Sequence, residues 1–79
     1  MIDIPTINTG MTGANITTLR KSAGLSVRDL QRAFGFNSPQ AIYKWQNGTA
    51  LPSLDNMIVL AALLHVRIDD ILVINHVAA

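Results

Sequence analysis

Short helices, each bounded by a start and a stop signal, are the dominant feature of this 79-residue sequence. From Ile16 to Leu72, apolar residues recur every three or four positions, which is the spacing of one helical face. Serine precedes several of these stretches, and glycine or Asn-Gly follows them. Helices of two or three turns joined by short loops are stable only when their apolar faces pack together. The pattern therefore predicts a compact all-α bundle.

Five helices are expected, all within one domain. We predict them within residues 12–24, 26–35, 38–47, 53–64 and 68–73. The residues expected to cap their N-termini with a side-chain oxygen are Thr12, Ser26, Ser38 and Ser53. Asp29 stands three residues after Ser26 and completes a capping box.

The two ends of the chain are expected to lie outside this bundle. We assign residues 12–74 to the domain, residues 1–11 to an extended N-terminal arm, and residues 75–79 to a frayed C-terminal tail. The sequence contains no strand pair with a hairpin signal, no internal repeat and no low-complexity segment.

Several classes of protein are excluded by what the sequence lacks. It has no cysteine, which fits a reducing compartment, and we expect a cytoplasmic protein. The N-terminus does not resemble a signal peptide, and the longest apolar run, Met57–Leu64, is far shorter than the roughly 20 residues of a membrane span. No nucleophile with a base, no phosphate-binding loop and no zinc-ligand spacing is present. We therefore expect neither an enzyme nor a cofactor or metal.

Charge is divided unevenly along the chain. The segment Arg20–Gly48 has a net charge of +4, from five basic residues and one acid, whereas the rest has −3, from one basic residue and four acids. Such an asymmetry is typical of a protein that meets an anion with one surface. Ordinary solvated surface charge is the alternative.

The third expected helix has one polar and one apolar side. At about 100° per residue, the polar side consists of Gln40, Tyr43, Lys44 and Asn47. The opposite side consists of Ala41, Ile42 and Trp45. We interpret Trp45 as a core anchor rather than a base-stacking residue. The polar side then faces solvent, where glutamine can pair with adenine and lysine can donate to guanine.

This helix follows the second one after a glycine-containing turn, as in the helix-turn-helix motifs that enter the DNA major groove. The predicted contacts to double-stranded DNA are the four polar-side residues, Ser38 at the helix start, and Arg28 on the outward side of the second helix. A plain solvated helix surface is the alternative for each of them.

Three stretches strengthen the DNA-binding interpretation: "LRKSAGLSVRDLQRAFGF", "AIYKWQNG" and "LPSLDNMIVLAALLHVRIDDIL". Together they resemble the phage-repressor and Cro-like (XRE-type) helix-turn-helix family from about Ile16 to Leu72. The resemblance implies a five-helix repressor-like fold and sequence-specific binding to double-stranded DNA, commonly as a dimer on a roughly palindromic operator. We expect a transcriptional regulator of the repressor type.

The sequence departs from the family pattern at four places. Gln31 replaces a small alanine, and Val27 replaces a glutamine that often touches the DNA backbone, which leaves Arg28 as the nearest substitute. The turn "GFNS" is one residue longer than the commonest version. Gln46 replaces an acid, so any pairing with Arg20 is expected to be a hydrogen bond to a neutral acceptor.

An apolar surplus in the fourth helix predicts association. In the resembled family the positions of Val59 and Ala62 are commonly polar, and an additional apolar patch is expected there. Leu63, Ile74 and Val77 are candidates to extend it. We predict a homodimer joined through the fourth helix, the fifth helix or the tail.

Two alternatives to this interpretation remain open. Ile2, Ile4 and Ile7 of the N-terminal arm can fold back over the same apolar patch and leave the protein monomeric. The whole bundle can also serve as a protein-interaction module, such as an antitoxin-like or anti-repressor adaptor that binds a protein partner.

Overall fold

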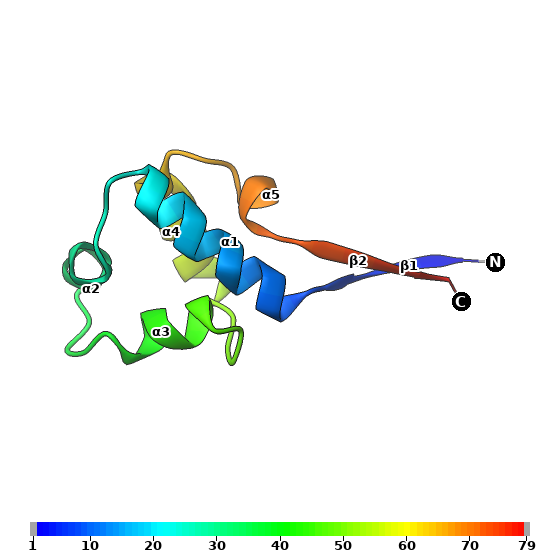
Figure 1. The fold of residues 1–79 in the computed structure, drawn as a ribbon, viewed down its shortest axis with the longest axis horizontal. Helices are drawn as coiled ribbons and strands as arrows, with labels where there is room; N and C mark the ends of the chain where they lie inside the picture. The colour runs from blue at the N-terminus through cyan, green and yellow to red at the C-terminus, as the bar shows by residue number, and fades with distance from the viewer. Residues whose placement is uncertain (1, 79) are drawn as a thin grey trace.

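Five helices and one two-stranded sheet make up the computed structural model, which describes residues 2–78. The helices pack together, and the sheet projects from them as a ribbon, so that the molecule measures 46 × 22 × 20 Å (Figure 1). In chain order the elements are β1 (Asp3–Ile7), α1 (Thr9–Ser22), α2 (Val27–Phe34), α3 (Gln40–Gln46), α4 (Leu54–Leu64), α5 (Ile68–Ile71) and β2 (Ile74–Ala78).

The helical bundle confirms the predicted five-helix fold, and two of the expected caps are formed as predicted. At α2, the backbone N–H of Asp29 donates to Ser26 Oγ at 2.9 Å, and the N–H of Ser26 donates to Asp29 Oδ2 at 2.8 Å. At α4, Ser53 Oγ accepts from the N–H of Asn56 at 3.2 Å. Local capping chemistry therefore sets both helix starts.

The start of α1 differs from the prediction. The helix begins at Thr9, and its cap is Asn8, whose Oδ1 accepts from the N–H of Met11 at 2.9 Å. Thr12 is not a cap but a fully buried helical residue, and its Oγ1 accepts from the N–H of Val73 at 2.9 Å. Asparagine caps as well as serine, so Asn8 can start the helix before the predicted cap at Thr12.

The start of α3 also differs from the prediction. Ser38 does not cap this helix, which begins one residue after Pro39 and has no side-chain hydrogen bond at its cap. Its predicted end is confirmed at Asn47, followed by Gly48 with a φ of 79°.

The last helix, α5, is shorter than predicted: it ends at Ile71 rather than at Val73. Asn15 of α1 donates from Nδ2 to the carbonyl oxygens of Asp70 at 2.7 Å and Ile71 at 3.0 Å. These two bonds satisfy carbonyl groups at the end of α5 from outside, and Leu72 then adopts an extended conformation that leads into β2.

Residues 75–78 are not a frayed tail but belong to β2, while Ala79 lies outside the described residues. The strands β1 and β2 pair antiparallel, in a register from Asp3 opposite Ala78 to Ile7 opposite Ile74. This ribbon was not predicted, because its strands come from opposite ends of the chain and no turn joins them. Ile4 and Ile7 lie opposite Val77 and Ile74, the two patch candidates from the C-terminal end, but they stay 45% and 42% exposed and project with the ribbon away from α4 (Figure 1).

The hydrophobic core lies between the helices, and α3 packs against it through Ile42 and Trp45. Its fully buried apolar residues come from every helix: Ile16, Leu30, Ile42, Leu60 and Ile71. Trp45 is 4% exposed and belongs to the same cluster, which confirms its prediction as a core anchor.

A glycine lets α1 and α3 approach closely. A Cβ atom at Gly13 would overlap the backbone carbonyl groups of Trp45 and Gln46, so any larger residue would push the two helices apart. Gly13 is itself buried, which leaves no room for relaxation toward solvent.

We predict that Gly13→Ala destabilises the protein by about 1–3 kcal/mol, the usual cost of overpacking, despite the higher helix propensity of alanine. Urea denaturation followed by circular dichroism measures the effect. Gly10→Ala in the same helix is the matched control, since a Cβ atom there meets only Asn8 Oδ1 at 3.8 Å. Equal stability of the two variants would contradict the proposed close contact.

Candidate nucleic-acid interface

The turn between α2 and α3 is fixed by backbone and side-chain bonds. Gly35 ends α2 in the left-handed conformation, with a φ of 70°, and the N–H of Phe36 donates to the carbonyl oxygen of Gln31 at 3.0 Å. The side chain of Gln31 donates in turn from Nε2 to the carbonyl oxygen of Phe36 at 3.2 Å. The glutamine that replaces the small residue of the family pattern therefore ties down the turn that precedes α3.

Three aromatic rings attach α3 to α2. Trp45 meets the rings of Phe34 and Phe36 edge-on, with centroid distances of 5.3 and 5.9 Å, and the two phenylalanine rings stack on each other at 5.1 Å. Edge-to-face pairs of this kind stabilise a fold beyond the area that they bury. Because Phe34 closes α2 and Phe36 lies in the turn, the cluster fixes the orientation of α3.

Arg20 provides a polar attachment for α3. Its Nε donates to Gln46 Oε1 at 2.9 Å, and its Nη1 donates to the carbonyl oxygen of Leu25 at 2.8 Å. The predicted hydrogen bond to a neutral acceptor is therefore confirmed. The guanidinium group links α1, the α1–α2 turn and the end of α3.

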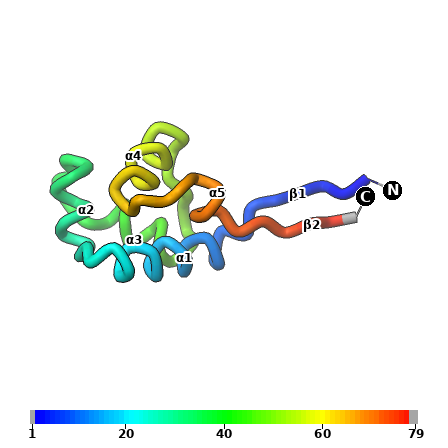
Figure 2. The backbone as a smooth tube through the Cα atoms, turned by 90° about the horizontal axis from the view of Figure 1, so that it is seen from above, coloured from blue at the N-terminus to red at the C-terminus, as the bar shows by residue number. Residues whose placement is uncertain are grey.

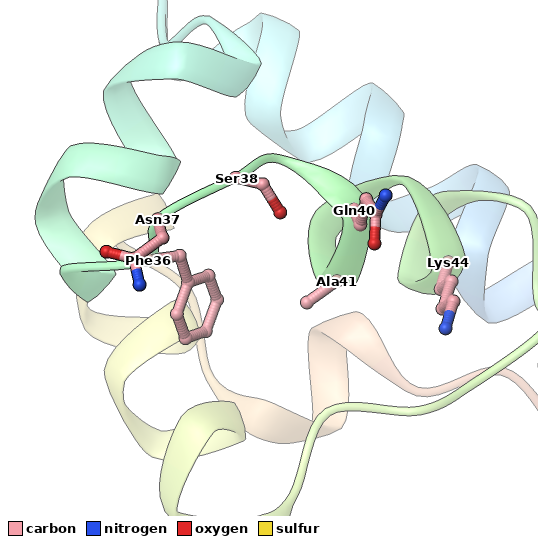
Figure 3. A pocket seen from close by; sticks show the side chains of 6 residues that line it. All are labelled: Phe36, Asn37, Ser38, Gln40, Ala41 and Lys44. Atoms are coloured by element: carbon pink, nitrogen blue, oxygen red, sulfur yellow. The ribbon is translucent and has the colours of Figure 1, made fainter.

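With its apolar side held in this way, α3 turns its polar side to solvent. Gln40, Tyr43, Lys44 and Asn47 are all exposed, whereas Ile42 is completely buried. The predicted division of the helix into two sides is confirmed for Ile42 and Trp45, whereas Ala41 is half-buried and lies at the boundary between the two sides. Figure 3 shows Gln40 and Lys44 projecting from the same helix.

A shallow hollow of about 350 Å³ lies beside the start of α3 (Figure 3). Its lining combines polar and apolar side chains, namely Phe36, Asn37, Ser38, Gln40, Ala41 and Lys44. Three of the predicted contact residues, Ser38, Gln40 and Lys44, thus come together here. Asn37 joins them, although it was not among the predicted contact residues. The extra residue in the turn "GFNS" is the signal that could have drawn attention to it.

The other predicted contact residues lie apart from the hollow. Tyr43 is 51% exposed on the polar side of α3, and Arg28 is exposed in the first turn of α2. Asn47 closes α3, because its Oδ1 accepts from the N–H of Thr49 at 2.9 Å and also from the Thr49 hydroxyl. The side-chain oxygen of Asn47 is therefore already hydrogen-bonded within the protein.

The basic residues near α3 carry charge that no acid neutralises directly. Between residues 2 and 78, Arg67 forms an ion pair with Asp69, and His76 forms a hydrogen-bonded pair with Asp3. Neither pair involves Arg28 or Lys44, so both cations face solvent without an acidic partner. An anion can approach them without displacing an existing ion pair.

One acid, Asp29, lies at the start of α2. Hydrogen bonds from the Ser26 backbone N–H and the Ser26 hydroxyl, together with the nearby charge of Arg32, lower the pKa of Asp29 below its usual value near 3.8. The Asp29 side chain is therefore a carboxylate at neutral pH, and it accepts the capping hydrogen bond from the Ser26 N–H.

Two further features of the described residues bear on function. Among residues 2–78 there is no group of three or more His, Asp or Glu side chains placed to hold a metal ion. None of the helices in that range has the length and apolar character needed to cross a membrane.

The comparisons with known proteins agree with this geometry. A helix-turn-helix family model matches residues 16–71, which is most of the chain. The protein belongs to the XRE-type helix-turn-helix family. The match supports a DNA-binding transcriptional regulator. No curated protein sequence matches the chain.

Two solved structures share the fold. The restriction-modification controller protein C.AhdI from Aeromonas hydrophila is 23% identical, with a TM-score of 0.71 over 81% of this chain and 96% of that protein. The clp gene regulator ClgR from C. glutamicum is 21% identical, with a TM-score of 0.68 over 80% of each chain. At such identities the likeness establishes the fold alone.

We predict that the capping box of α2 makes stability depend on pH in the acid range. The folded-state pKa of Asp29 is lowered, so its contribution to stability is present above about pH 3.8 and is lost as the pH falls through the lower folded value. Asp29→Asn, which has no charge to lose, is expected to be less stable than the wild type near neutrality. The difference in stability between the two proteins should narrow below about pH 4. Thermal unfolding of both proteins between pH 3 and 7 measures it, and a constant difference would contradict the prediction.

Proposed function

We propose that the protein is a sequence-specific transcriptional regulator of the repressor type, which inserts α3 into the major groove of double-stranded DNA as a homodimer. The observation that carries the proposal is the exposed polar side of α3, which presents hydrogen-bonding groups and a cation and has no acidic residue. An α-helix fits the width of the major groove, where base edges are distinguishable by their donors and acceptors.

The residues around the hollow supply base-reading chemistry. Gln40 can donate to and accept from adenine, and Lys44 can donate to the acceptor atoms of guanine. Phe36 and Ala41 give the same hollow an apolar part, which suits the methyl group of thymine. Asn37 and Ser38 add exposed polar groups at its edge.

Contacts to phosphate are proposed for residues that flank α3. Val27 stands at the start of α2 and offers no side-chain donor, so Arg28 beside it is the available group. Tyr43 and the amide N–H₂ of Asn47 are further donors on the exposed side of α3. Such contacts position a protein on the duplex without reading its sequence.

The size of the module supports the proposed homodimer. A single module of this kind buries only about 600–1,000 Å² against DNA, and few cations are available for counterion release. Two copies on a roughly palindromic operator would double both contributions. Half-sites would then lie about 34 Å apart, or a multiple of this distance.

An exposed apolar stripe on α4 favours a second candidate function, a protein-interaction module of the antitoxin-like or anti-repressor type. Leu54, Ile58 and Val59 are 73%, 54% and 41% exposed, and Ala62 is exposed beside them. Exposed patches of this kind mark association sites. The stripe fits either the second copy of a homodimer or a different protein.

We predict that Gln40→Ala and Lys44→Ala each weaken binding to a preferred duplex by about 1–3 kcal/mol, roughly 5- to 150-fold, because each removes one base contact. Neither should change the thermal midpoint, since both side chains are exposed. The duplex is first selected from a random pool, and affinity is measured by fluorescence anisotropy. Lys21→Ala, which removes an exposed lysine from α1 rather than from α3, is the control. Unchanged affinity of the Gln40/Lys44 double variant would rule out the proposed role of these residues.

We also predict a steep salt dependence of binding to mixed-sequence duplex DNA. Each phosphate-neutralising cation contributes about −0.9 to the slope of log K against log salt, so Arg28→Ala should make the slope shallower by about one. Anisotropy at several salt concentrations measures both slopes. Absence of binding at low salt would favour the protein-interaction module instead.

A further inference from the structure

The β1–β2 ribbon extends away from the helices and has both faces in solvent (Figures 1 and 2). Its apolar residues remain exposed: Ile4 and Val77 are 45% and 51% exposed, and Ile7 and Ile74 are 42% and 39% exposed. An isolated pair of strands is marginally stable at best in water. The ribbon therefore has the composition of a surface that is completed by another strand or face.

The direction of its free backbone groups follows from one hydrogen bond. The N–H of Asn8 donates to the carbonyl oxygen of Val73 at 2.8 Å, just beyond the register pair of Ile7 and Ile74. Bonded and non-bonded pairs alternate along an antiparallel ladder, so Ile7 and Ile74 form a non-bonded pair. Their own N–H and C=O groups point outward, away from the opposite strand.

The same alternation defines two unequal edges. On β1, the outward positions are Asp3, Pro5 and Ile7. Pro5 has no N–H, so the row of donors on this edge is interrupted at its centre, as is usual for proline in an edge strand. On β2, the outward positions are Ile74, His76 and Ala78, and all three have an N–H. The β2 edge is therefore the one that can accept another strand along its whole length.

We propose that the β2 edge is a self-association surface, on which β2 of a second copy pairs antiparallel to form a four-stranded sheet. An edge that pairs antiparallel with its own copy satisfies two-fold symmetry, because the same groups meet on both sides. The register that uses the whole strand places His76 opposite the same residue of the second copy. Each outward residue then exchanges backbone hydrogen bonds across the new edge.

The charges of the ribbon favour a second copy over a nucleic acid. Residues 2–7 and 74–78 contain no lysine or arginine. Asp3 is hydrogen-bonded within the ribbon to His76, whose Nδ1 lies 2.8 Å from Asp3 Oδ2. The ribbon thus offers no lysine or arginine side chain to phosphate, and the same hydrogen bond holds the Asp3 side chain against its own ribbon.

The arrangement also suits the proposed function, on which this one step rests. The strands overlap in Figure 1 and lie side by side in Figure 2, so Figure 1 views the sheet nearly edge-on, with α3 on one side of its plane. A two-fold axis perpendicular to the sheet leaves the α3 helices of both copies on that same side. The two helices can then face one DNA duplex.

His76→Pro tests the proposal with little change to the ribbon itself. The backbone N–H of His76 points outward, and the residue opposite it on β1 is Pro5. Replacing His76 by proline therefore removes one backbone donor from the free edge and no hydrogen bond to β1. The control is His76→Ala, which loses the side chain and the Asp3 contact but keeps the N–H. Sedimentation equilibrium from micromolar to millimolar concentration, without DNA, gives the dissociation constant of each dimer.

The wild type is expected to dimerise weakly, because an edge contact is smaller than the roughly 1,200 Å² of a stable interface. His76→Pro should raise the dissociation constant at least about tenfold, and His76→Ala should change it much less. A monomeric wild type at millimolar concentration would overturn the proposal. Equal effects of His76→Pro and His76→Ala on the dissociation constant would also overturn it. A dimer that His76→Pro leaves intact and Ile58→Glu on α4 abolishes would place the interface on α4 instead.

Amide hydrogen exchange of the wild type gives a second measurement, which decides the matter if His76→Pro does not fold. The N–H groups of Ile74 and His76 should exchange more slowly as the protein concentration rises. The N–H of Ile7, on the interrupted edge, should not. Fast exchange at Ile74 and His76 at every concentration would overturn the proposal. Because neither measurement uses DNA, its outcome is independent of whether α3 binds a duplex.

Discussion

The seating of Trp45 against the aromatic side chains of α2 and the following turn is the interaction on which the rest of the structure depends. A helix as short as α3 cannot hold its own conformation in water, so its shape and direction must come from packing. Phe34 and Phe36 hold the indole, Gly13 admits the backbone at close range, and Arg20 binds Gln46 at the end of the helix. Together these contacts turn a marginal helix into a rigid support.

The same seating explains how a small domain presents a chemically distinct surface. Burial of Ile42 and Trp45 leaves the side chains one position away, such as Tyr43 and Lys44, directed outward. The apolar residues therefore determine the placement of the polar ones. The family model covers both α2 and α3, the two helices that this seating joins.

The sequence was sufficient where structure depends on near neighbours. The capping box of Ser26 and Asp29 and the two sides of α3 follow from spacing within a few residues, and each was predicted correctly. The bond between Arg20 and Gln46 came from the family pattern. The ribbon was missed because β1 and β2 are separated by the whole domain, and their register has no local signal. The role of Thr12 was missed for the same reason, since its partner, Val73, is distant in sequence. The DNA contacts of individual side chains remain predictions.

The neutral acceptor of Arg20 has a consequence for the behaviour of the protein in different solutions. Gln46 has no ionisable group, and its bond to the guanidinium does not join two opposite charges that mobile ions could shield. The attachment of α3 to α1 should therefore persist across ionic strengths that strip cationic side chains from phosphate. Release from a polyanion by concentrated electrolyte would then leave the docking helix in place, ready to rebind on dilution.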